Sequence, residues 1–289
     1  MKVVVTGAGG LVGRAVVEHC ASHGDDVRGF DHQSLDISDT SSVQTALNDS
    51  KPDVVINCAA WTDVDGCESD REHAERANAL GPERLAATCR DIDALLITIS
   101  TDYVFDGSKE GFYTQRDQPY PISVYGRSKL GGERRAQAAW ARTIVVRSGY
   151  IFGVGGKNFL STLLPRAGRG ESLKAISDMV GTPTYAPDLA RRLRELTAVD
   201  LPGIFHVVNS GAGVSFEDFA RAALEMAGLN SALLTRVTLA DLHRPAPRPR
   251  NSRLRCLWSE ALRLEALPHW TEALRSFVSL QSGSASTAG

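Results

Sequence analysis

The sequence contains no long run of apolar residues. Its apolar runs, such as Val3-Val4-Val5 and Val54-Val55-Ile56, are far shorter than the roughly 20 residues that a membrane-spanning helix needs. It also shows no charged and then apolar leader, because Met1-Lys2-Val3 passes directly into a predicted strand. We therefore expect a soluble cytoplasmic protein that has no membrane partner.

An excess of charge of one sign is absent, and so is any pattern of paired cysteines. The net charge is −2, so neither nucleic acid nor an anionic membrane surface is expected as a partner. The five cysteines are odd in number and form no Cys-x-x-Cys pair, which favours free thiols in a reducing compartment. The seven histidines are scattered, so no zinc site is predicted.

The first half of the chain alternates short β-branched runs with amphipathic stretches. Such alternation predicts parallel βαβ units with right-handed crossovers, and hence a Rossmann-type doubly wound α/β sheet. Strands are expected at 3–6, 26–30, 54–57, 95–100 and 143–147, and helices at 11–23, 43–49, 73–90 and 125–139.

The second half is less regular and predicts a smaller α+β domain for the substrate. Helices are expected at 158–169 and 216–227, and a strand at 204–209 is expected to return to the main sheet. We therefore place an NAD(P)-binding domain at 1–152, a mainly substrate-binding domain at 153–280, and the active site in the cleft between them. Residues 281–289 are small and polar, and are expected to form a disordered tail.

A glycine-rich turn separates the first predicted strand from the first predicted helix. Gly7, Gly10 and Gly13 have the spacing G-x-x-G-x-x-G within Gly7-Ala8-Gly9-Gly10-Leu11-Val12-Gly13. One glycine permits the tight turn, one lets the backbone approach a pyrophosphate, and one packs the helix on the strand. The helix N-terminus offers free N–H groups and the positive end of its dipole to phosphates. The turn therefore predicts a dinucleotide cofactor.

An acid at the end of the second predicted strand bears on which cofactor is bound. Asp31 lies at the distance from the glycines at which a carboxylate meets the cofactor's ribose, which favours NAD(H). Arg28 and His32 nearby suit the 2′-phosphate of NADP(H) instead. Asp36, followed by Ile37, either faces the adenine amino group or caps the segment 38–49. NADP(H) and NAD(H) both remain open.

Tyr125 and Lys129 stand four residues apart, and therefore on one face of the predicted helix. An ammonium beside a phenol favours the phenolate and lowers a pKa that starts at about 10. Thr101 follows the predicted strand 95–100, at the sheet edge where ligands bind in open α/β folds. In a carbonyl reduction Tyr125 would donate the proton and Thr101 would hydrogen-bond the oxygen. Lys129 would lower the pKa of the phenol and hold the nicotinamide ribose.

The glycine turn and the Tyr-x-x-x-Lys pair resemble the extended short-chain dehydrogenase/reductases. Five segments are similar, more specifically, to the dTDP-4-dehydrorhamnose reductases, and this resemblance extends to about residue 278. These segments are Asn57-Cys58-Ala59-Ala60-Trp61-Thr62-Asp63-Val64-Asp65-Gly66-Cys67-Glu68, Ser100-Thr101-Asp102-Tyr103-Val104-Phe105-Asp106-Gly107, Val124-Tyr125-Gly126-Arg127-Ser128-Lys129, Gly181-Thr182-Pro183-Thr184 and Arg248-Pro249-Arg250-Asn251-Ser252-Arg253-Leu254.

The resemblance implies reduction of a dTDP-linked 4-keto-6-deoxy sugar, dTDP-4-dehydrorhamnose to dTDP-rhamnose, by NADPH or NADH in a monomer or a homodimer. It implies Thr101, Tyr125 and Lys129 as the catalytic residues. Implied cofactor contacts are Gly7, Gly9, Gly10, Leu11, Val12, Gly13, Asp31, Asp36, Ile37, Ala59, Ala60 and Thr62, with Tyr125 and Lys129. Implied substrate contacts are Val64, Asp65, Asp102, Val104, Phe105, Tyr150, Asn158 and Arg250.

The sequence departs from this family at several positions. Tyr150 and Met179 stand where members often carry Trp and Gln, so the exact hexose stays open. Ala15 replaces an acid through which some members bridge a dimer with a metal ion, so no such metal is predicted. The segment 243–255 carries five arginines and no acid, and at least one arginine is expected near the substrate's diphosphate.

Two other functions are compatible with the same motifs. One relative of these reductases is a non-catalytic regulatory subunit of methionine adenosyltransferase, which binds a nicotinamide nucleotide. A nucleotide-sugar epimerase or dehydratase is the other alternative, and a dehydratase requires an acid after Thr101, where Asp102 stands. Capture of a partner enzyme without turnover would indicate the first, and a stoichiometric tightly bound NAD would indicate an epimerase.

Overall fold

A six-stranded parallel sheet forms the centre of the protein. The computed structural model describes residues 1–285, with side chains up to residue 281. The strand order is β10-β5-β4-β3-β1-β2, so the direction of winding reverses between β1 and β3. The strands are β1 (Lys2–Thr6), β2 (Asp26–Phe30), β3 (Val54–Asn57), β4 (Leu95–Thr101), β5 (Thr143–Ser148) and β10 (Gly203–His206). β10 is the strand expected at 204–209, and it pairs in parallel with β5 at the sheet edge.

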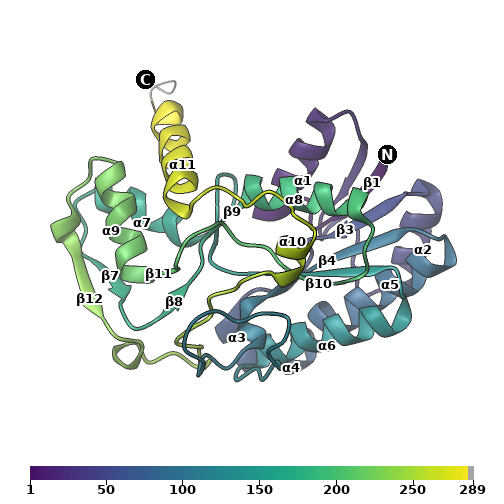
Figure 1. The fold of residues 1–289 in the computed structure, drawn as a ribbon, viewed down its shortest axis with the longest axis horizontal. Helices are drawn as coiled ribbons and strands as arrows, with labels where there is room; N and C mark the ends of the chain where they lie inside the picture. Colours follow the sequence, from purple (N-terminus) through teal and green to yellow (C-terminus); the bar gives the residue numbers. More distant parts are fainter. Residues whose placement is uncertain (286–289) are drawn as a thin grey trace.

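Helices cover both faces of the sheet, because alternate side chains of each strand point to opposite faces. Val3 and Val5 of β1 belong to a core that includes α1 (Leu11–Ser22) and α8 (Ala186–Val199). Val4 belongs to the opposite core, with α2 (Thr40–Ser50), α5 (Gly81–Asp91) and α6 (Val124–Ala139). Figure 1 shows α1 and α8 on one side of the sheet and α5 and α6 on the other. The predicted doubly wound α/β fold is confirmed.

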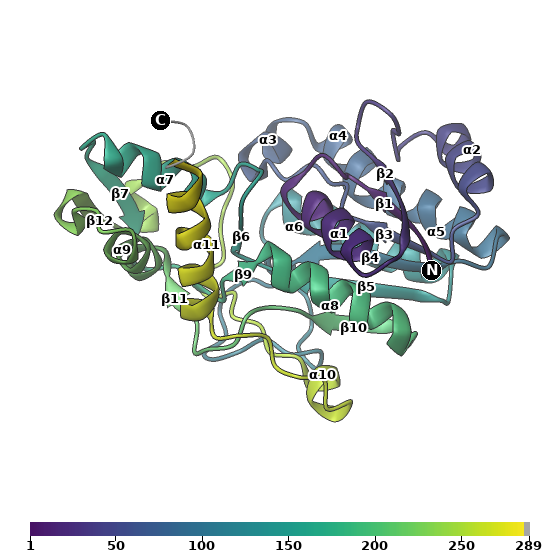
Figure 2. The same ribbon diagram turned by 90° about the horizontal axis from the view of Figure 1, so that it is seen from above.

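A smaller unit lies beside the sheet, at the left of Figures 1 and 2. Its core joins α7 (Phe159–Gly168), α9 (Phe216–Met226) and α11 (Trp270–Ala285). Short strands pair two by two: β6 (Ile151–Phe152) with β9 (Thr184–Tyr185), β7 (Leu173–Ile176) with β12 (Leu234–Val237), and β8 (Val180–Gly181) with β11 (Val214–Ser215). Among the helices described, none is both long and apolar enough to cross a membrane.

The arginine-rich segment 243–255 is ordered by backbone hydrogen bonds, although it forms no helix. The Tyr113 N–H donates to the Arg253 carbonyl at 2.7 Å, and the Val180 N–H donates to the Arg250 carbonyl at 2.7 Å. The segment therefore ties the smaller unit to the loop that follows β4. The short helix α10 (Leu257–Ala261) comes after it.

The helix expected at 73–90 is interrupted. It consists of α4 (Arg71–Glu75), a π-helical turn (Arg76–Leu80) and α5, and it follows α3 (Val64–Ser69). In the π turn Asn78 is buried, and its amide exchanges hydrogen bonds with the Trp61 N–H (2.8 Å) and the Trp61 carbonyl (2.9 Å). The wider turn directs Asn78 toward the loop after β3, which a regular α-helical pattern does not predict.

The tail predicted to be disordered at 281–289 is ordered in its first part. α11 continues to Ala285, so residues 281–285 are helical, and residues 286–289 lie outside the described residues. Leu274, Phe277 and Val278 anchor the preceding turns of α11 in a core. An existing helix extends by one hydrogen bond for each residue fixed, which favours extension even through small polar residues.

A buried ion pair fastens α6 to the sheet. The side chains of Arg147 on β5 and Glu133 on α6 are 3% and 2% exposed, with Arg147 Nη2 2.6 Å from Glu133 Oε2. Arg147 Nε also donates to Glu133 Oε1 at 2.9 Å, and the Ser100 hydroxyl donates to the same oxygen. The two-pronged pairing and the added hydroxyl compensate for the loss of water around both charges.

We expect Glu133→Ala to destabilise the protein by about 3–5 kcal/mol, because it leaves the Arg147 guanidinium buried without a partner. Urea unfolding followed by circular dichroism measures the change in the free energy of unfolding. Glu72→Ala is the matched control, since it breaks an exposed pair with Arg76 and should cost less than about 1 kcal/mol. Equal losses in the two variants would contradict the assigned role of the buried pair.

Candidate active site

Two neighbouring cavities open at the carboxyl ends of the strands. One, of about 550 Å³, is lined by the glycine turn, by the end of β4 and by the start of α6. The other, of about 820 Å³, lies between the glycine turn and the ends of β2 and β3. Both cavities are lined by Gly9, Gly10, Cys58 and Ala60, so they meet at the start of α1. This edge is where open α/β sheets bind ligands, at the reversal of winding.

The glycine turn has the close packing that a dinucleotide cradle requires. A Cβ at Gly13 would lie 2.1 Å from the Gly7 carbonyl oxygen, so only glycine lets α1 approach β1 this closely. Gly10 is the N-cap of α1 and offers no side-chain cap, which leaves the first N–H groups of the helix available to an anion. The geometry of this turn therefore fits the pyrophosphate of a dinucleotide.

The larger cavity collects the residues expected at the adenosine end of the cofactor. Asp31, Asp36, Ile37 and Ala59 line it. Asp31 Oδ1 accepts hydrogen bonds from the Ser34 hydroxyl (2.8 Å) and the Ser34 N–H (3.0 Å), and these bonds lower the pKa of Asp31. Asp36 Oδ1 accepts from the Ser38 N–H at 2.8 Å, so its carboxylate both lines the cavity and caps the following turn.

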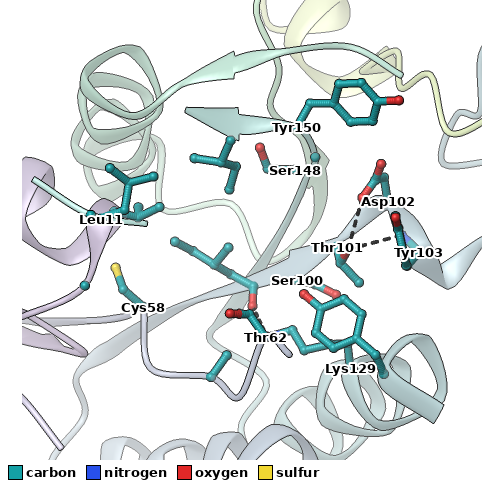
Figure 3. A pocket seen from close by; sticks show the side chains of 18 of the residues that line it. Leu11, Cys58, Thr62, Ser100, Thr101, Asp102, Tyr103, Lys129, Ser148 and Tyr150 are labelled. Atoms are coloured by element: carbon teal, nitrogen blue, oxygen red, sulfur yellow. Dashed lines mark hydrogen bonds between the residues drawn. The ribbon is translucent and has the colours of Figure 1, made fainter. Parts of the chain in front are cut away.

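The smaller cavity brings the three expected catalytic residues together. Thr101 is the last residue of β4, while Tyr125 and Lys129 lie in the first half of α6, and all three line the cavity. α6 begins at Ser123, whose hydroxyl accepts from the Gly126 N–H at 3.1 Å. A Cβ at Gly126 would lie 2.2 Å from the Tyr103 carbonyl oxygen, so glycine allows α6 to pass directly over the end of β4. Figure 3 shows Thr101 and Lys129 in this cavity.

The expected lowering of the Tyr125 pKa by Lys129 is not found. Burial raises the pKa of Tyr125 above its usual value, and the Thr101 hydroxyl is the group that opposes this shift. The Lys129 ammonium instead donates to the Ile99 carbonyl at 2.7 Å. Burial also lowers the pKa of Lys129 to about 8, although the nearby charge of Glu133 acts in the opposite direction. The four-residue spacing places the Tyr125 and Lys129 side chains on one face of α6, but the ammonium does not lower the pKa of the phenol.

The expected substrate residues divide into two groups. Val64, Asp102 and Tyr150 line the smaller cavity with Thr62 of the cofactor set. Asp102 is 3% exposed, and burial raises its pKa to about 6 against the hydrogen bonds of the Ser252 and Thr101 hydroxyls. Tyr150 has a left-handed backbone (φ 47°), and its ring lies against the Phe216 ring with centroids 4.0 Å apart.

The other expected substrate residues lie elsewhere. Val104 and Phe105 are fully buried, because the 3₁₀ turn Asp102–Val104 bends them inward, where Phe105 stacks on Tyr113. Asp65 binds Arg248 (2.8 Å), whose hydrogen bond lowers the pKa of Asp65 to about 2. Asn158 caps α7. Arg250 is exposed, and its backbone carbonyl accepts a hydrogen bond from the Val180 N–H. None of these five residues lines either of the two cavities.

Several lining residues were not predicted. Lys157 and Gly156 border the smaller cavity, and Arg14 and Arg76 border the larger one. Asn78 holds the loop that carries Ala59–Thr62, through its bonds to Trp61. No motif or spacing in the sequence marks these residues as site residues, because tertiary packing brings each of them to the site. Within the described part of the chain, no group of three or more His, Cys, Asp or Glu side chains could hold a metal ion.

Comparisons with known proteins agree on one family. Residues 1–282 match the family described as the RmlD substrate binding domain. The dTDP-4-dehydrorhamnose reductase of Mycolicibacterium smegmatis is 38% identical over 286 residues, which cover 98% of this chain and 86% of that protein.

Two solved structures extend the agreement to three dimensions. A dTDP-4-dehydrorhamnose reductase from Clostridium acetobutylicum has a TM-score of 0.93 and 36% identity, covering 98% of this chain and 100% of that one. A Bacillus anthracis dTDP-4-dehydrorhamnose reductase in complex with NADP has a TM-score of 0.92 and 32% identity, covering 96% and 98%. The chain therefore belongs to the RmlD substrate binding domain family, together with these dTDP-4-dehydrorhamnose reductases.

Proposed function

We propose that this protein reduces the 4-keto group of dTDP-4-dehydrorhamnose to give dTDP-rhamnose, with NADPH or NADH as the hydride donor. One observation carries the proposal: Thr101, Tyr125 and Lys129 line the same cavity as Gly9–Gly13 of the nucleotide turn. A keto sugar in this cavity would lie between a phenol and the bound nicotinamide. The names of the relatives at 36–38% identity support the same substrate.

In the proposed reaction the nicotinamide, when bound, supplies a hydride to the keto carbon. Tyr125 donates its proton to the keto oxygen as negative charge grows there. The raised pKa of Tyr125 keeps the phenol protonated at neutral pH, which is the form that a proton donor needs for reduction. Thr101 stands beside the phenol, and its hydroxyl donates to Asp102 Oδ1 at 3.0 Å.

Lys129 has a second role in the proposal. Its ammonium is fixed by the Ile99 carbonyl at the floor of the cavity, where it would bind the nicotinamide ribose and stabilise developing negative charge. The positive charge exists only below its pKa, which burial lowers to about 8. The proposed enzyme should therefore be most active on the acid side of that value.

Tyr150 is proposed to contact the sugar. Its ring is held between Phe216 and Gly181, where a Cβ would lie 2.5 Å from the Tyr150 ring. Its hydroxyl donates to the Met179 carbonyl at 3.3 Å. The strained left-handed backbone at Tyr150 is maintained by this packing, as expected for a residue that shapes a binding site.

The location and assembly of the protein are also proposals. All five cysteines are free thiols, which supports a reducing, cytoplasmic location. We propose a monomer or a homodimer with no metal bridge, since Ala15 has no ligand to offer.

The decisive assay supplies purified protein with dTDP-4-dehydrorhamnose and either NADPH or NADH. Oxidation of the nicotinamide is followed by absorbance, and the C4 stereochemistry of the product is determined by NMR. Cofactor binding without turnover, together with capture of a partner enzyme, would indicate a regulatory subunit instead. Net epimerisation with retained cofactor would indicate an epimerase.

We expect Tyr125→Phe to lower kcat by about 10²–10⁴-fold, the usual contribution of a positioned proton donor. The ring is kept, so NADPH binding measured by fluorescence should be unchanged. Tyr120→Phe is the control, because Tyr120 is 73% exposed and should lose no activity. Full activity in Tyr125→Phe would exclude Tyr125 as the donor.

We expect kcat/KM to fall as the pH rises through about 8, because the Lys129 ammonium loses its proton there. Lys129→Met should remove this fall and lower activity at neutral pH by about tenfold or more, since one stabilising charge is lost. Arg134→Met, at an exposed position of α6, should keep the wild-type profile. Persistence of the fall in Lys129→Met would assign it to another group.

We expect Asp31→Asn to shift the cofactor preference toward NADPH by about tenfold. The Asp31 carboxylate repels a 2′-phosphate, while Arg14, His32 and Arg76 line the same cavity and attract one. The ratio of kcat/KM for NADPH and NADH measures the shift. Asp49→Asn, an exposed change on α2, should leave the ratio unaltered.

A further inference from the structure

Asp102 is a buried acid with one oxygen free of hydrogen bonds. Its residue is 3% exposed, and it lines the smaller cavity. Oδ1 accepts the proton of the Thr101 hydroxyl at 3.0 Å, whereas Oδ2 has no hydrogen bond of regular geometry within the described part of the chain. The Ser252 hydroxyl is the other side-chain group that acts on this carboxyl. Figure 3 shows the carboxyl between Thr101 and Tyr150. A buried, unpartnered oxygen is costly, so its retention beside the catalytic residues requires an explanation.

The proton of the Thr101 hydroxyl is engaged in this arrangement. It accepts from the Tyr103 N–H at 3.2 Å and donates its only proton to Asp102. A hydroxyl has one proton and two lone pairs. While Asp102 is a carboxylate, Thr101 therefore has no proton to offer a keto oxygen, although it stands beside Tyr125.

We propose that Asp102 determines the direction in which the Thr101 hydroxyl donates, and so whether the keto oxygen receives one hydrogen bond or two. This inference rests on the proposed reductase function. As a carboxylate, Asp102 takes the Thr101 proton, and only Tyr125 donates to the keto oxygen. As a carboxylic acid, Asp102 donates to the Thr101 oxygen, and the Thr101 proton turns to the keto oxygen.

The proton balance of the reaction is unchanged by this switch. The keto carbon gains the hydride, the keto oxygen gains the proton of Tyr125, and the proton of Asp102 stays on Asp102. Asp102 is therefore a positioning residue that acts through Thr101. Two donors at the keto oxygen stabilise the growing negative charge better than one, so the protonated form of Asp102 is the more active form.

Burial shifts Asp102 toward its protonated form, while the hydrogen bonds of the Ser252 and Thr101 hydroxyls favour the carboxylate. The phenols of Tyr103, Tyr125 and Tyr150 interact with it across the cavity. The ion pair of Arg248 with Asp65 acts on Tyr103. A Cβ at Gly149 would lie 2.4 Å from the carboxyl, so the backbone just after β5 is in close contact with Asp102. Burial raises the pKa of Asp102 to about 6, and a bound sugar would remove still more water.

The kinetic test compares wild type with Asp102→Asn and Thr101→Val over a range of pH. In the wild type, kcat for reduction should fall about tenfold as the pH rises through the pKa of Asp102, by loss of one donor to the keto oxygen. Asp102→Asn cannot ionise and should show no such fall, while the fall assigned to Lys129 remains. Thr101→Val should be less active and equally free of the Asp102-dependent fall.

Two kinetic outcomes would overturn the inference. A fall that persists in Thr101→Val would mean that the Asp102 charge acts without Thr101. A uniform loss of activity in Asp102→Asn, with the wild-type pH profile kept, would mean a purely structural role. Asp106→Asn is the matched control, because Asp106 binds Ser108 and Tyr113 outside both cavities and should leave the profile intact.

A second measurement needs no turnover. Infrared difference spectroscopy of the protein without ligands should show the C=O stretch of a protonated carboxyl that disappears as the pH rises through about 6. The band should be missing in Asp102→Asn and present in Asp106→Asn. Absence of a titrating band in the wild type would overturn the switch. A titrating band with no sugar reduction by any variant would instead refute the proposed function, which distinguishes the two failures.

Discussion

The site depends on how α6 packs against β4 and β5. Tyr125, Lys129 and Glu133 follow one another at four-residue intervals, so one buried face of α6 carries the phenol, the ammonium and the anchoring carboxylate. Glu133 is clamped by Arg147 and Ser100, two residues of adjacent strands. The Lys129 ammonium donates to the Ile99 carbonyl of β4. The helix therefore cannot slide along the sheet without breaking buried polar contacts, and Tyr125 remains at the end of β4.

The parts of the site that could be predicted are those fixed by local sequence. The glycine turn and the Tyr125–Lys129 pair lie within single strand–helix units, where spacing decides which side chains share a face. Thr101 could be placed because strand ends of a parallel sheet meet at one edge. Periodicity predicted these elements to within a few residues, and it also predicted that β10 would return to the sheet.

Sequence was least informative where tertiary packing decides the outcome. Phe105 and Val104 belong to a motif next to Thr101, the proposed catalytic threonine, but a 3₁₀ turn directs them into the core. Asp65 forms an ion pair with Arg248, which is 183 residues away in sequence. No local sequence pattern reveals such a pairing. The π turn places the buried Asn78 amide against Trp61, a contact that a regular helical pattern does not predict. The pKa of Tyr125 depends on burial, which outweighs the ammonium four residues away.

Burial acts on Asp102, Tyr125 and Lys129 in the same physical sense, by favouring the neutral form of each side chain. It raises the pKa of Tyr125 and of Asp102, and it lowers the pKa of Lys129. Asp102 at about 6 and Lys129 at about 8 therefore lie on either side of neutral pH. Small changes in hydration of the cavity, such as those caused by a bound sugar, can then move protons among groups that would otherwise hold fixed charges. Hydride transfer would benefit, because negative charge that grows on a keto oxygen is stabilised by protonated donors held beside it.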